Sequence, residues 1–439
     1  MSGVAIAALG FGVMLLLIAL RAPVGLSMLV VGAIGYIHLS SWPAFFAYMK
    51  TNPYYQFANY TLSVIPLFIL MGALAERSGI STSLFKAAEA FAGRMRGGLA
   101  MSVIWACTAF GAICGSSVAT TATFGRAALP ELQRYKYDGG FATGTIAVGG
   151  TLGILIPPSI ILVVYAITTE QNIAKLFKAA LIPGLMAALF YTLAIAWTVR
   201  RRPHVAPPIS ADAIADRGRA IVTVWPVLLV ALTVIGGIYG GVFTPTEGAA
   251  FGAIAMLIVG LAQRTLTFRG ILESLRQTAE TSAMIFIILL GSEVFDAFLA
   301  LSKLPERAAD LVGHSGLPPY AIVITLMLFY ILLGAVMDEL AMILLTLPVF
   351  FPIVQALDFG MPPDEVAIWF GILVLIVVGI GLTAPPIGLN VFVISSIAKT
   401  VPIASTYRGV LPFIATDIVR LGLVIAFPGL ALWLVRLLN

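Results

Sequence analysis

Charged residues are scarce in this chain. Only 10% of its 439 residues are Asp, Glu, Lys or Arg, whereas 60% are hydrophobic. A soluble globular domain carries about 25% charged residues, so the composition excludes an ordinary soluble enzyme. Apolar segments fill nearly the whole length, and each is close to the ~20 residues that cross the hydrocarbon core of a bilayer. We therefore expect an all-α polytopic membrane protein.

Cysteine and histidine are also scarce, with two and three residues respectively. Cys107 and Cys114 share one apolar segment, and they have no metal-ligand spacing with His38, His204 or His314. The Gly-x-Gly-Asp run of an intramembrane aspartyl protease is absent, and no His lies centrally in a span, as a serine-type intramembrane protease needs. The net charge of +5 is spread along the loops. We expect no enzyme, no cofactor and no nucleic-acid partner.

The second half of the chain repeats the first. The run Gly-Ile-Leu-Ile-Pro-Pro-Ser at 153–159 recurs as Gly-Leu-Thr-Ala-Pro-Pro-Ile at 381–387. Three further pairs keep a similar spacing, and they are Pro23 with Pro245, Gly72 with Gly291, and Pro183 with Pro412. A slowly drifting spacing is expected of a duplicated unit with a few insertions. Proline-interrupted apolar segments at matching places in two halves indicate the midplane binding site of a secondary transporter.

The repeat predicts two units, residues 1–199 and 221–439, joined by a polar linker at 200–220. Each unit has three spans, a short amphipathic arm, a bent segment, a broken segment and a last span. In the first unit we expect these at 4–20, 23–40, 61–76, 83–95, 99–130, 140–168 and 174–199. In the second unit we expect them at 221–243, 245–262, 279–300, 303–313, 318–355, 366–398 and 409–436. The arms carry one apolar and one charged face, as helices in contact with the lipid interface do.

The cations indicate the orientation. If each bent segment enters and leaves by one face, each unit crosses five times and the second unit is inverted. With the linker in the cytoplasm, 18 of the 25 Lys and Arg lie inside, and the N-terminus is periplasmic or extracellular. Cytoplasmic loops carry an excess of Lys and Arg, so this count favours re-entrant hairpins. The inside cations are Arg21, Arg77, Lys86, Arg94, Arg96, Arg126, Arg134, Lys136, Arg200, Arg201, Arg202, Arg217, Arg219, Arg264, Arg269, Arg276, Lys399 and Arg408.

Each hairpin tip is expected to meet the Pro-Pro break of its own unit, because non-helical backbone survives in hydrocarbon only where protein or a cavity satisfies it. Freed carbonyls and hydroxyls there suit a hard cation such as Na⁺. The first Na⁺ site is expected to use Ser116, Ser117, Gly153, Ile156 and Pro158. The second is expected to use Gly334, Asp338, Gly381, Thr383, Ala384 and Ile387. Helix N-termini at the tips would attract an anionic substrate.

Other polar residues leave alternatives open. Arg126, on the returning limb of the first hairpin, could hold a substrate carboxylate bidentately or could set topology at the cytoplasmic face. Asp338 could lie at the hairpin tip or in a solvated loop. Glu293 and Asp296, and also Asp417 and Arg420, are candidate coupling-ion groups. For Asp417 and Arg420, at spacing three on one helix face, the favoured alternative is a structural ion pair.

At these residues the chain resembles the large membrane subunit of tripartite ATP-independent periplasmic (TRAP) transporters over nearly its whole length. The passages that carry the resemblance are Gly115-Ser116-Ser117-Val118-Ala119-Thr120, Leu129-Pro130-Glu131-Leu132, Gly153 to Ser159, Gly241 to Glu247, and Pro385-Pro386-Ile387-Gly388-Leu389-Asn390. The family usually has Thr directly before the second Pro-Pro. Here Ala384 takes that place and Thr383 precedes it, so the backbone carbonyl of Ala384 is the ligand expected there.

The resemblance implies an elevator-type importer of an organic acid, driven by a Na⁺ gradient, in the bacterial inner membrane. It also implies a periplasmic substrate-binding protein and a small four-span membrane subunit on a separate chain. Candidate substrate-binding residues are Ser116, Ser117, Arg126, Asp338 and Asn390. The alternative is a stand-alone carboxylate or ion symporter of the same hairpin architecture.

Overall fold

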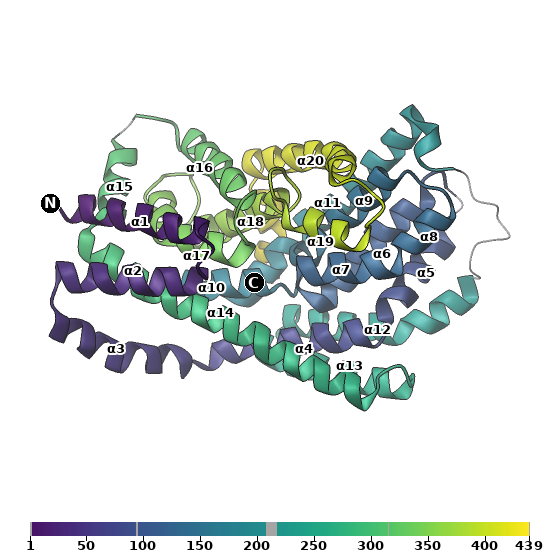
Figure 1. Cartoon of the computed structure of the whole chain (residues 1–439), viewed down its shortest axis with the longest axis horizontal. Coiled ribbons are helices and arrows are strands. Elements are labelled where there is room, and N and C mark those ends of the chain that lie inside the picture. The colour runs from purple at the N-terminus through teal and green to yellow at the C-terminus, as the bar shows by residue number, and fades with distance from the viewer. Residues whose placement is uncertain (1, 94, 208–216, 315, 439) are drawn as a thin grey trace.

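The computed structural model describes residues 2–93, 95–207, 217–314 and 316–438. Arg94 of the first arm, and residues 208–216 of the predicted linker, lie outside the described residues. Within the described ranges the chain forms helices and no strand (Figure 1). Seven of these helices are long and apolar enough to cross a membrane, or eight if one bent pair counts as a span. The predicted all-α polytopic fold class is confirmed.

The first half begins with α1, α2 and α3, and a 3-10 turn leads into α4. The arm α5, the hairpin limbs α6 and α7 and the short α8 follow, and the broken pair α9–α10 precedes the long α11. The bounds are α1 (Gly3–Ala19), α2 (Val24–Leu39), α3 (Trp42–Phe57), 3-10 (Tyr60–Ser63), α4 (Val64–Arg77), α5 (Ile80–Ala92), α6 (Gly98–Cys114), α7 (Ser117–Ala127), α8 (Leu129–Arg134), α9 (Gly139–Leu155), α10 (Ile160–Thr168) and α11 (Ile173–Arg201).

After a second 3-10 turn (Pro203–Val205), the second half repeats this order. It has two spans, a long helix, an arm, a hairpin, a broken pair and a final pair. The bounds are α12 (Arg217–Tyr239), α13 (Pro245–Ala262), α14 (Phe268–Ser302), the arm α15 (Leu304–Gly313), the hairpin limbs α16 (Pro319–Gly334) and α17 (Glu339–Gln355), the broken pair α18 (Pro363–Gly381) and α19 (Leu389–Ile397), α20 (Ile403–Ala426) and α21 (Gly429–Leu437).

Both predicted hairpins and both broken helices are present. The first hairpin turns at Gly115, whose φ of 64° lies in the left-handed region that favours glycine. The axes of α9 and α10 meet at a bend of 44°. In the second half the interruption around Pro385-Pro386 separates α18 from α19. Proline cannot donate a backbone hydrogen bond in a helix interior, which is why each apolar segment stops at its Pro-Pro.

In three places the helices differ from those predicted. Residues 42–57, to which no element was assigned from the sequence, form the helix α3, none of whose residues is buried. The helix predicted at 279–300 starts earlier, at Phe268, and the Arg269–Glu273 and Arg276–Glu280 pairs lie on that charged extension. The span predicted at 409–436 is wrong. It is divided at Phe427–Pro428 into α20 and α21, because a residue before proline is driven out of helical backbone.

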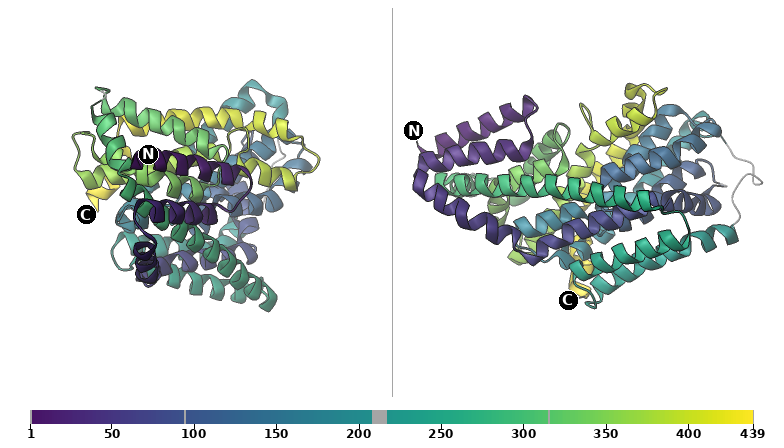
Figure 2. Two further views of the ribbon diagram at one scale, coloured as in Figure 1. Left: turned by 60° about the vertical axis from the view of Figure 1, so that its left-hand side comes forward. Right: turned by 60° about the horizontal axis from the view of Figure 1, so that its bottom comes forward.

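Helices of the two halves pack against each other reciprocally. The long α14 lies along α2 and α4, as the views of Figures 1 and 2 show, and α4 in turn packs against α13. The broken helix α9 packs against α20, while its counterpart α18 packs against α11. The returning hairpin limbs follow the same rule, since α7 contacts α19 and α17 contacts α10. The inverted orientation of the two units stays a prediction.

Candidate functional site

The first hairpin tip lies against the first Pro-Pro break. The Ile160 amide donates a hydrogen bond to the Gly115 carbonyl over 3.5 Å. A Cβ added at Gly115 would lie 2.9 Å from the Pro158 carbonyl oxygen, and one added at Gly153 would lie 2.6 Å from that of Ser116. The structure thus brings Ser116, Gly153 and Pro158 together. It places Ile156 at the end of α9, with its side chain next to Gly184 of α11.

The second hairpin tip meets the second break in the same way. The Ile387 amide donates to the Ala335 carbonyl over 3.1 Å. Backbone packs on backbone beside it, because a Cβ added at Gly381 would lie 2.6 Å from the Gly334 carbonyl carbon. The Thr383 hydroxyl is buried and donates back to the Ile380 carbonyl over 3.1 Å. The carbonyl oxygens of Thr383 and Ala384 both lie beside Gly388, the residue before α19.

A cavity of about 550 Å³ lies between the two hairpin tips and is bordered by α4 and α14. Ser116, Arg126 and Asp338 line it, so the structure brings three of the five predicted substrate residues to one space. The remaining lining includes residues that the sequence did not single out for substrate. These are Glu76 on α4, Gln277 and Thr281 on α14, Glu339 on α17, and apolar side chains of α7, α10, α14, α17 and α19.

Four helices begin at this cavity, namely α7, α10, α17 and α19. The start of α7 is capped by the Ser116 hydroxyl, which accepts from the Ala119 amide, and the start of α17 by the Asp338 carboxylate, which accepts from the Leu340 and Ala341 amides. At α10 and α19 the residues before the helix, Ser159 and Gly388, make no side-chain cap. Helix N-termini carry partial positive charge. The cavity thus combines these four helix starts with the carboxylates of Glu76, Asp338 and Glu339 and the guanidinium of Arg126.

Ser117 and Asn390 lie behind the cavity and bind each other. Both side chains are buried, and the Asn390 amide nitrogen lies 2.7 Å from the Ser117 hydroxyl and 3.0 Å from the Ala147 carbonyl oxygen. This contact joins α7, α9 and α19, and neither residue lines the cavity. The two residues predicted to touch substrate therefore hold the hairpin of one half on the broken helix of the other.

Arg126 forms an ion pair with Glu76, with 2.6 Å between the guanidinium and the carboxylate. The Arg126 side chain is 59% exposed and that of Glu76 is 18% exposed. Both residues also line a second, polar cavity of about 690 Å³ together with Arg77, Arg269 and Glu273. The pair thus stands between the two cavities, and it joins the first hairpin to α4.

The sequence reasoning also missed Tyr407, on α20. Its hydroxyl lies within hydrogen-bonding distance of the carbonyl oxygens of Pro386, at 2.9 Å, and Ile387, at 2.6 Å. Ile387 was expected to offer its carbonyl to Na⁺, so Tyr407 competes for that oxygen. No local signal marks this residue, because its partner lies some twenty positions earlier in the chain. Glu76 had a local signal, since it is an acidic residue at the end of a predicted span.

The remaining charged candidates lie elsewhere. Glu293 and Asp296 are on α14 beside α3, where the Tyr48 hydroxyl donates to the Glu293 carbonyl, and neither lines the cavity between the tips. Asp417 and Arg420 form the expected ion pair on α20, with 2.9 Å between carboxylate and guanidinium and both side chains almost fully buried. The Tyr191 hydroxyl donates to Asp417 over 2.7 Å. This pair is a structural contact between α11 and α20.

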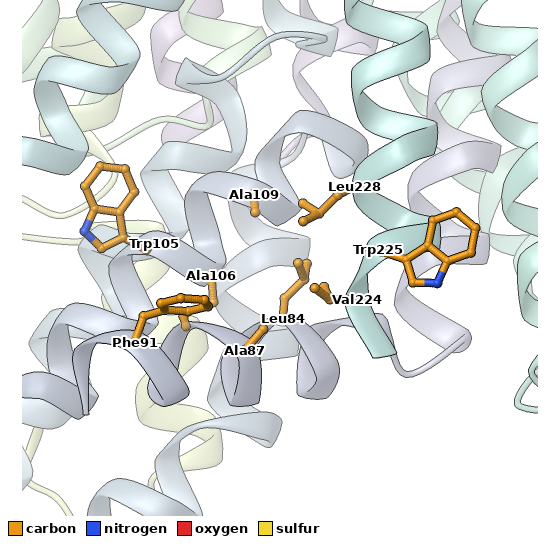
Figure 3. A pocket seen from close by; sticks show the side chains of 10 residues that line it. Leu84, Ala87, Phe91, Trp105, Ala106, Ala109, Val224, Trp225 and Leu228 are labelled. Atoms are coloured by element: carbon orange, nitrogen blue, oxygen red, sulfur yellow. The ribbon is translucent and has the colours of Figure 1, made fainter. Parts of the chain in front are cut away.

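An apolar pocket of about 330 Å³ lies between the arm α5, the hairpin limb α6 and the span α12 (Figure 3). Among the described residues, no charged side chain lines it, so these residues offer nothing to orient an anion. Its position among membrane helices fits contact with lipid tails. The lining residues are Leu84, Ala87, Ala88, Phe91, Trp105, Ala106, Ala109, Val224, Trp225 and Leu228.

Comparison with known proteins gives a family match, similar relatives and a similar solved structure. Residues 11–430 match the family described as "Tripartite ATP-independent periplasmic transporter, DctM component". The C4-dicarboxylate TRAP transporter large permease protein DctM of Pseudomonas aeruginosa is 35% identical, and the alignment covers 85% of this chain and 86% of that protein. The sialic acid TRAP transporter large permease protein SiaM of Vibrio cholerae is 30% identical, with 86% and 87% covered.

Among solved structures, the crystal structure of the Alcanivorax borkumensis YdaH transporter is similar to this chain with a TM-score of 0.63. The match covers 88% of this chain and 89% of that one, at 16% sequence identity. A likeness at this identity shows a shared fold alone.

Proposed function

Because the chain belongs to the DctM component family of tripartite ATP-independent periplasmic transporters, we propose that it imports a small organic acid together with Na⁺. The observation that carries this proposal is the cavity between the hairpin tips, where four helices begin. Partial positive charge at those starts suits a carboxylate. The relatives named for C4-dicarboxylates and sialic acid support the same substrate class.

Na⁺ would bind where each hairpin tip meets its break. The supporting geometry is the crowding of backbone oxygens there, with the Ser116 and Pro158 carbonyls near the first tip and those of Gly334, Thr383 and Ala384 near the second. Carbonyl oxygens are hard ligands that suit a hard cation. A cation at the second tip would also offset the Asp338 and Glu339 carboxylates, which face the cavity beside it. An anionic substrate would then meet less repulsion.

The proposed assembly follows the tripartite family. A periplasmic binding protein would deliver the substrate, and a small membrane subunit on another chain would extend the part of this chain that stays fixed. The N-terminus would be periplasmic in the bacterial inner membrane, as the excess of cations on one face supports. Single cysteines at Lys86 and Arg307, on the two arms, should then be labelled from opposite faces. Labelling of both from one face would refute the inversion.

Uptake into proteoliposomes tests this function. The chain, its small subunit and its binding protein would be reconstituted with a ligand identified by thermal-shift screening of the binding protein. Uptake should require an inward Na⁺ gradient and should rise more steeply than first order in Na⁺, since two sites are proposed. Undiminished uptake with only a proton gradient would refute the proposed coupling to Na⁺. Equal uptake without the binding protein would establish the stand-alone symporter instead.

A further inference from the structure

A basic cavity lies between the end of α11 and the start of α20, away from the hairpin tips. It has two adjoining lobes of about 470 and 240 Å³, which share Thr198, Arg202, Arg408 and Pro412. Arg201 lines the larger lobe as well. Three guanidinium groups from two helices therefore converge on one space. None of these three arginines has a role in the proposed transport route.

In the part of the chain that the structure describes, these three arginines lack carboxylate partners. Within the described residues, Arg201, Arg202 and Arg408 form no ion pair, although all three are exposed. Asp138 lines the smaller lobe, but its carboxylate caps α9 by accepting from the Phe141 amide over 2.9 Å. Six other exposed arginines pair with carboxylates, and these are Arg77, Arg126, Arg134, Arg269, Arg276 and Arg436. Arg21, Arg96 and Arg264 are exposed and form no ion pair within the described residues, but they lie apart and line neither lobe. The cavity thus holds positive charge without a partner from the described chain.

Part of the wall of the larger lobe is formed by exposed apolar side chains. Trp197 is 52% exposed and Leu411 is 56% exposed. The Arg201 guanidinium lies 4.5 Å from the centre of the Trp197 ring, a cation–π contact that holds the charge at the edge of the apolar wall. Tryptophan and arginine near the end of a span are typical of the border between lipid tails and headgroups. The cavity therefore has a charged rim and an apolar side.

We propose that this cavity binds an anionic phospholipid, with its phosphate held by Arg201, Arg202 and Arg408 and one acyl chain along Trp197 and Leu411. Basic pockets between membrane helices on the cytoplasmic side bind such headgroups. Arginine presents its donors in a fork that matches phosphate oxygens. A soluble phosphate ion would leave the exposed side chains of Trp197 and Leu411 uncovered, whereas the acyl chain of a lipid would cover them.

The bound lipid would join α11 to α20 at one end of the helix pair (Figure 1). Because α20 packs against the broken helix α9, the lipid would hold in place an element that carries the first predicted Na⁺ site. The proposal needs neither Na⁺ nor a substrate, so lipid binding can be measured whatever the transported solute is.

Lipid retention on the purified full chain tests the proposal. Phosphatidylglycerol and phosphatidylcholine with the same acyl chains would be titrated in a neutral detergent and the bound lipid counted by native mass spectrometry. The pocket triple R201Q/R202Q/R408Q should bind phosphatidylglycerol on the order of a hundredfold more weakly, since each cation near an anionic headgroup contributes about a factor of five. Phosphatidylcholine binding should be weak throughout.

The matched control is R21Q/R96Q/R264Q, which removes the same charge from exposed arginines that line neither lobe. It should bind phosphatidylglycerol as the unmodified chain does. If it lost affinity equally, net charge and not the cavity would govern binding, and the proposal would fall. Equal binding by the pocket triple would overturn it too, as would displacement of the lipid by inorganic phosphate alone. If the pocket triple proves unstable, R201K/R202K/R408K keeps the charge and should lose affinity only partly, through the missing fork.

Discussion

At the scale of single residues, Arg126 and Glu76 stand where the cavity at the hairpin tips meets the second, polar cavity. The guanidinium was expected either to hold a carboxylate or to set topology, and in the structure it is neutralised by Glu76 at 2.6 Å. Exposed pairs contribute only about 0–1 kcal/mol to stability, and more than half of the Arg126 side chain is exposed. The pair therefore acts mainly on how α7 and α4 meet.

Exchanging the two charges separates these roles. Arg126→Gln and Glu76→Gln should each lower uptake by up to about fivefold, equivalent to ~1 kcal/mol, because the contact between hairpin and α4 is lost. The swap E76R/R126E should restore most of the uptake, since the pair is rebuilt in reverse. Arg134→Gln, in the exposed Arg134–Glu131 pair on α8, is the control and should have no effect. A swap as poor as R126Q would instead show that the Arg126 charge acts on the substrate directly.

At the scale of elements, the hairpin tips and the Pro-Pro breaks were the most predictable part. Gly115 and the two Pro-Pro pairs fix the turn and the breaks locally, because glycine permits the left-handed conformation and proline removes a helix donor. The sequence could not reveal that Ser117 and Asn390 bind each other, or that Tyr407 donates to the second break. Those contacts depend on how distant helices pack. The helix α3 was not predicted because its sequence mixes polar and apolar residues and lacks the continuous apolar pattern of a span.

Because each hairpin tip packs closely on its Pro-Pro break, adding one methyl group at the contact should cause a steric clash. In a helix interior, alanine is more favourable than glycine by about 1 kcal/mol. A Gly→Ala substitution should therefore stabilise the folded protein unless the added Cβ clashes with a neighbouring atom. At Gly153 it would lie 2.4 Å from the Thr120 hydroxyl, and at Gly381 2.6 Å from the Gly334 backbone. We expect G153A and G381A to lower the Tm and to flatten the Na⁺ dependence of uptake.

Gly422 is the matched control, because a Cβ there meets no atom within 4 Å. G422A on α20 should keep or raise the Tm and leave uptake unchanged. Should G153A raise the Tm as G422A does, the first tip would not be packed on its break as described.

At the scale of the whole molecule, reciprocal packing suggests two bodies. One is built from α2, α4, α13 and α14, in which α14 packs on α2 and α4 while α13 packs on α4, and the other from the hairpins, the broken helices, α11 and α20. Two halves with the same packing rules can reach inward- and outward-facing states of similar free energy. In the importer that we propose, the second body would move, with both proposed Na⁺ sites, against the first. The Arg126–Glu76 contact lies on the boundary between the two bodies.

A cross-link across that boundary tests the movement. With Cys107 and Cys114, which are buried and unpaired, replaced by alanine, the pair E76C/R126C would be joined by a short, cleavable thiol reagent. Uptake should be abolished, because the first hairpin can no longer slide past α4, while Na⁺ should still raise the Tm because both proposed Na⁺ sites lie within the second body. Cleaving the linker should return uptake to the level of the uncross-linked pair, and the reagent should leave the uptake of E76C or R126C alone at the level that each variant has without it. Uptake that persists at complete cross-linking would mean that these two bodies do not move relative to each other during transport.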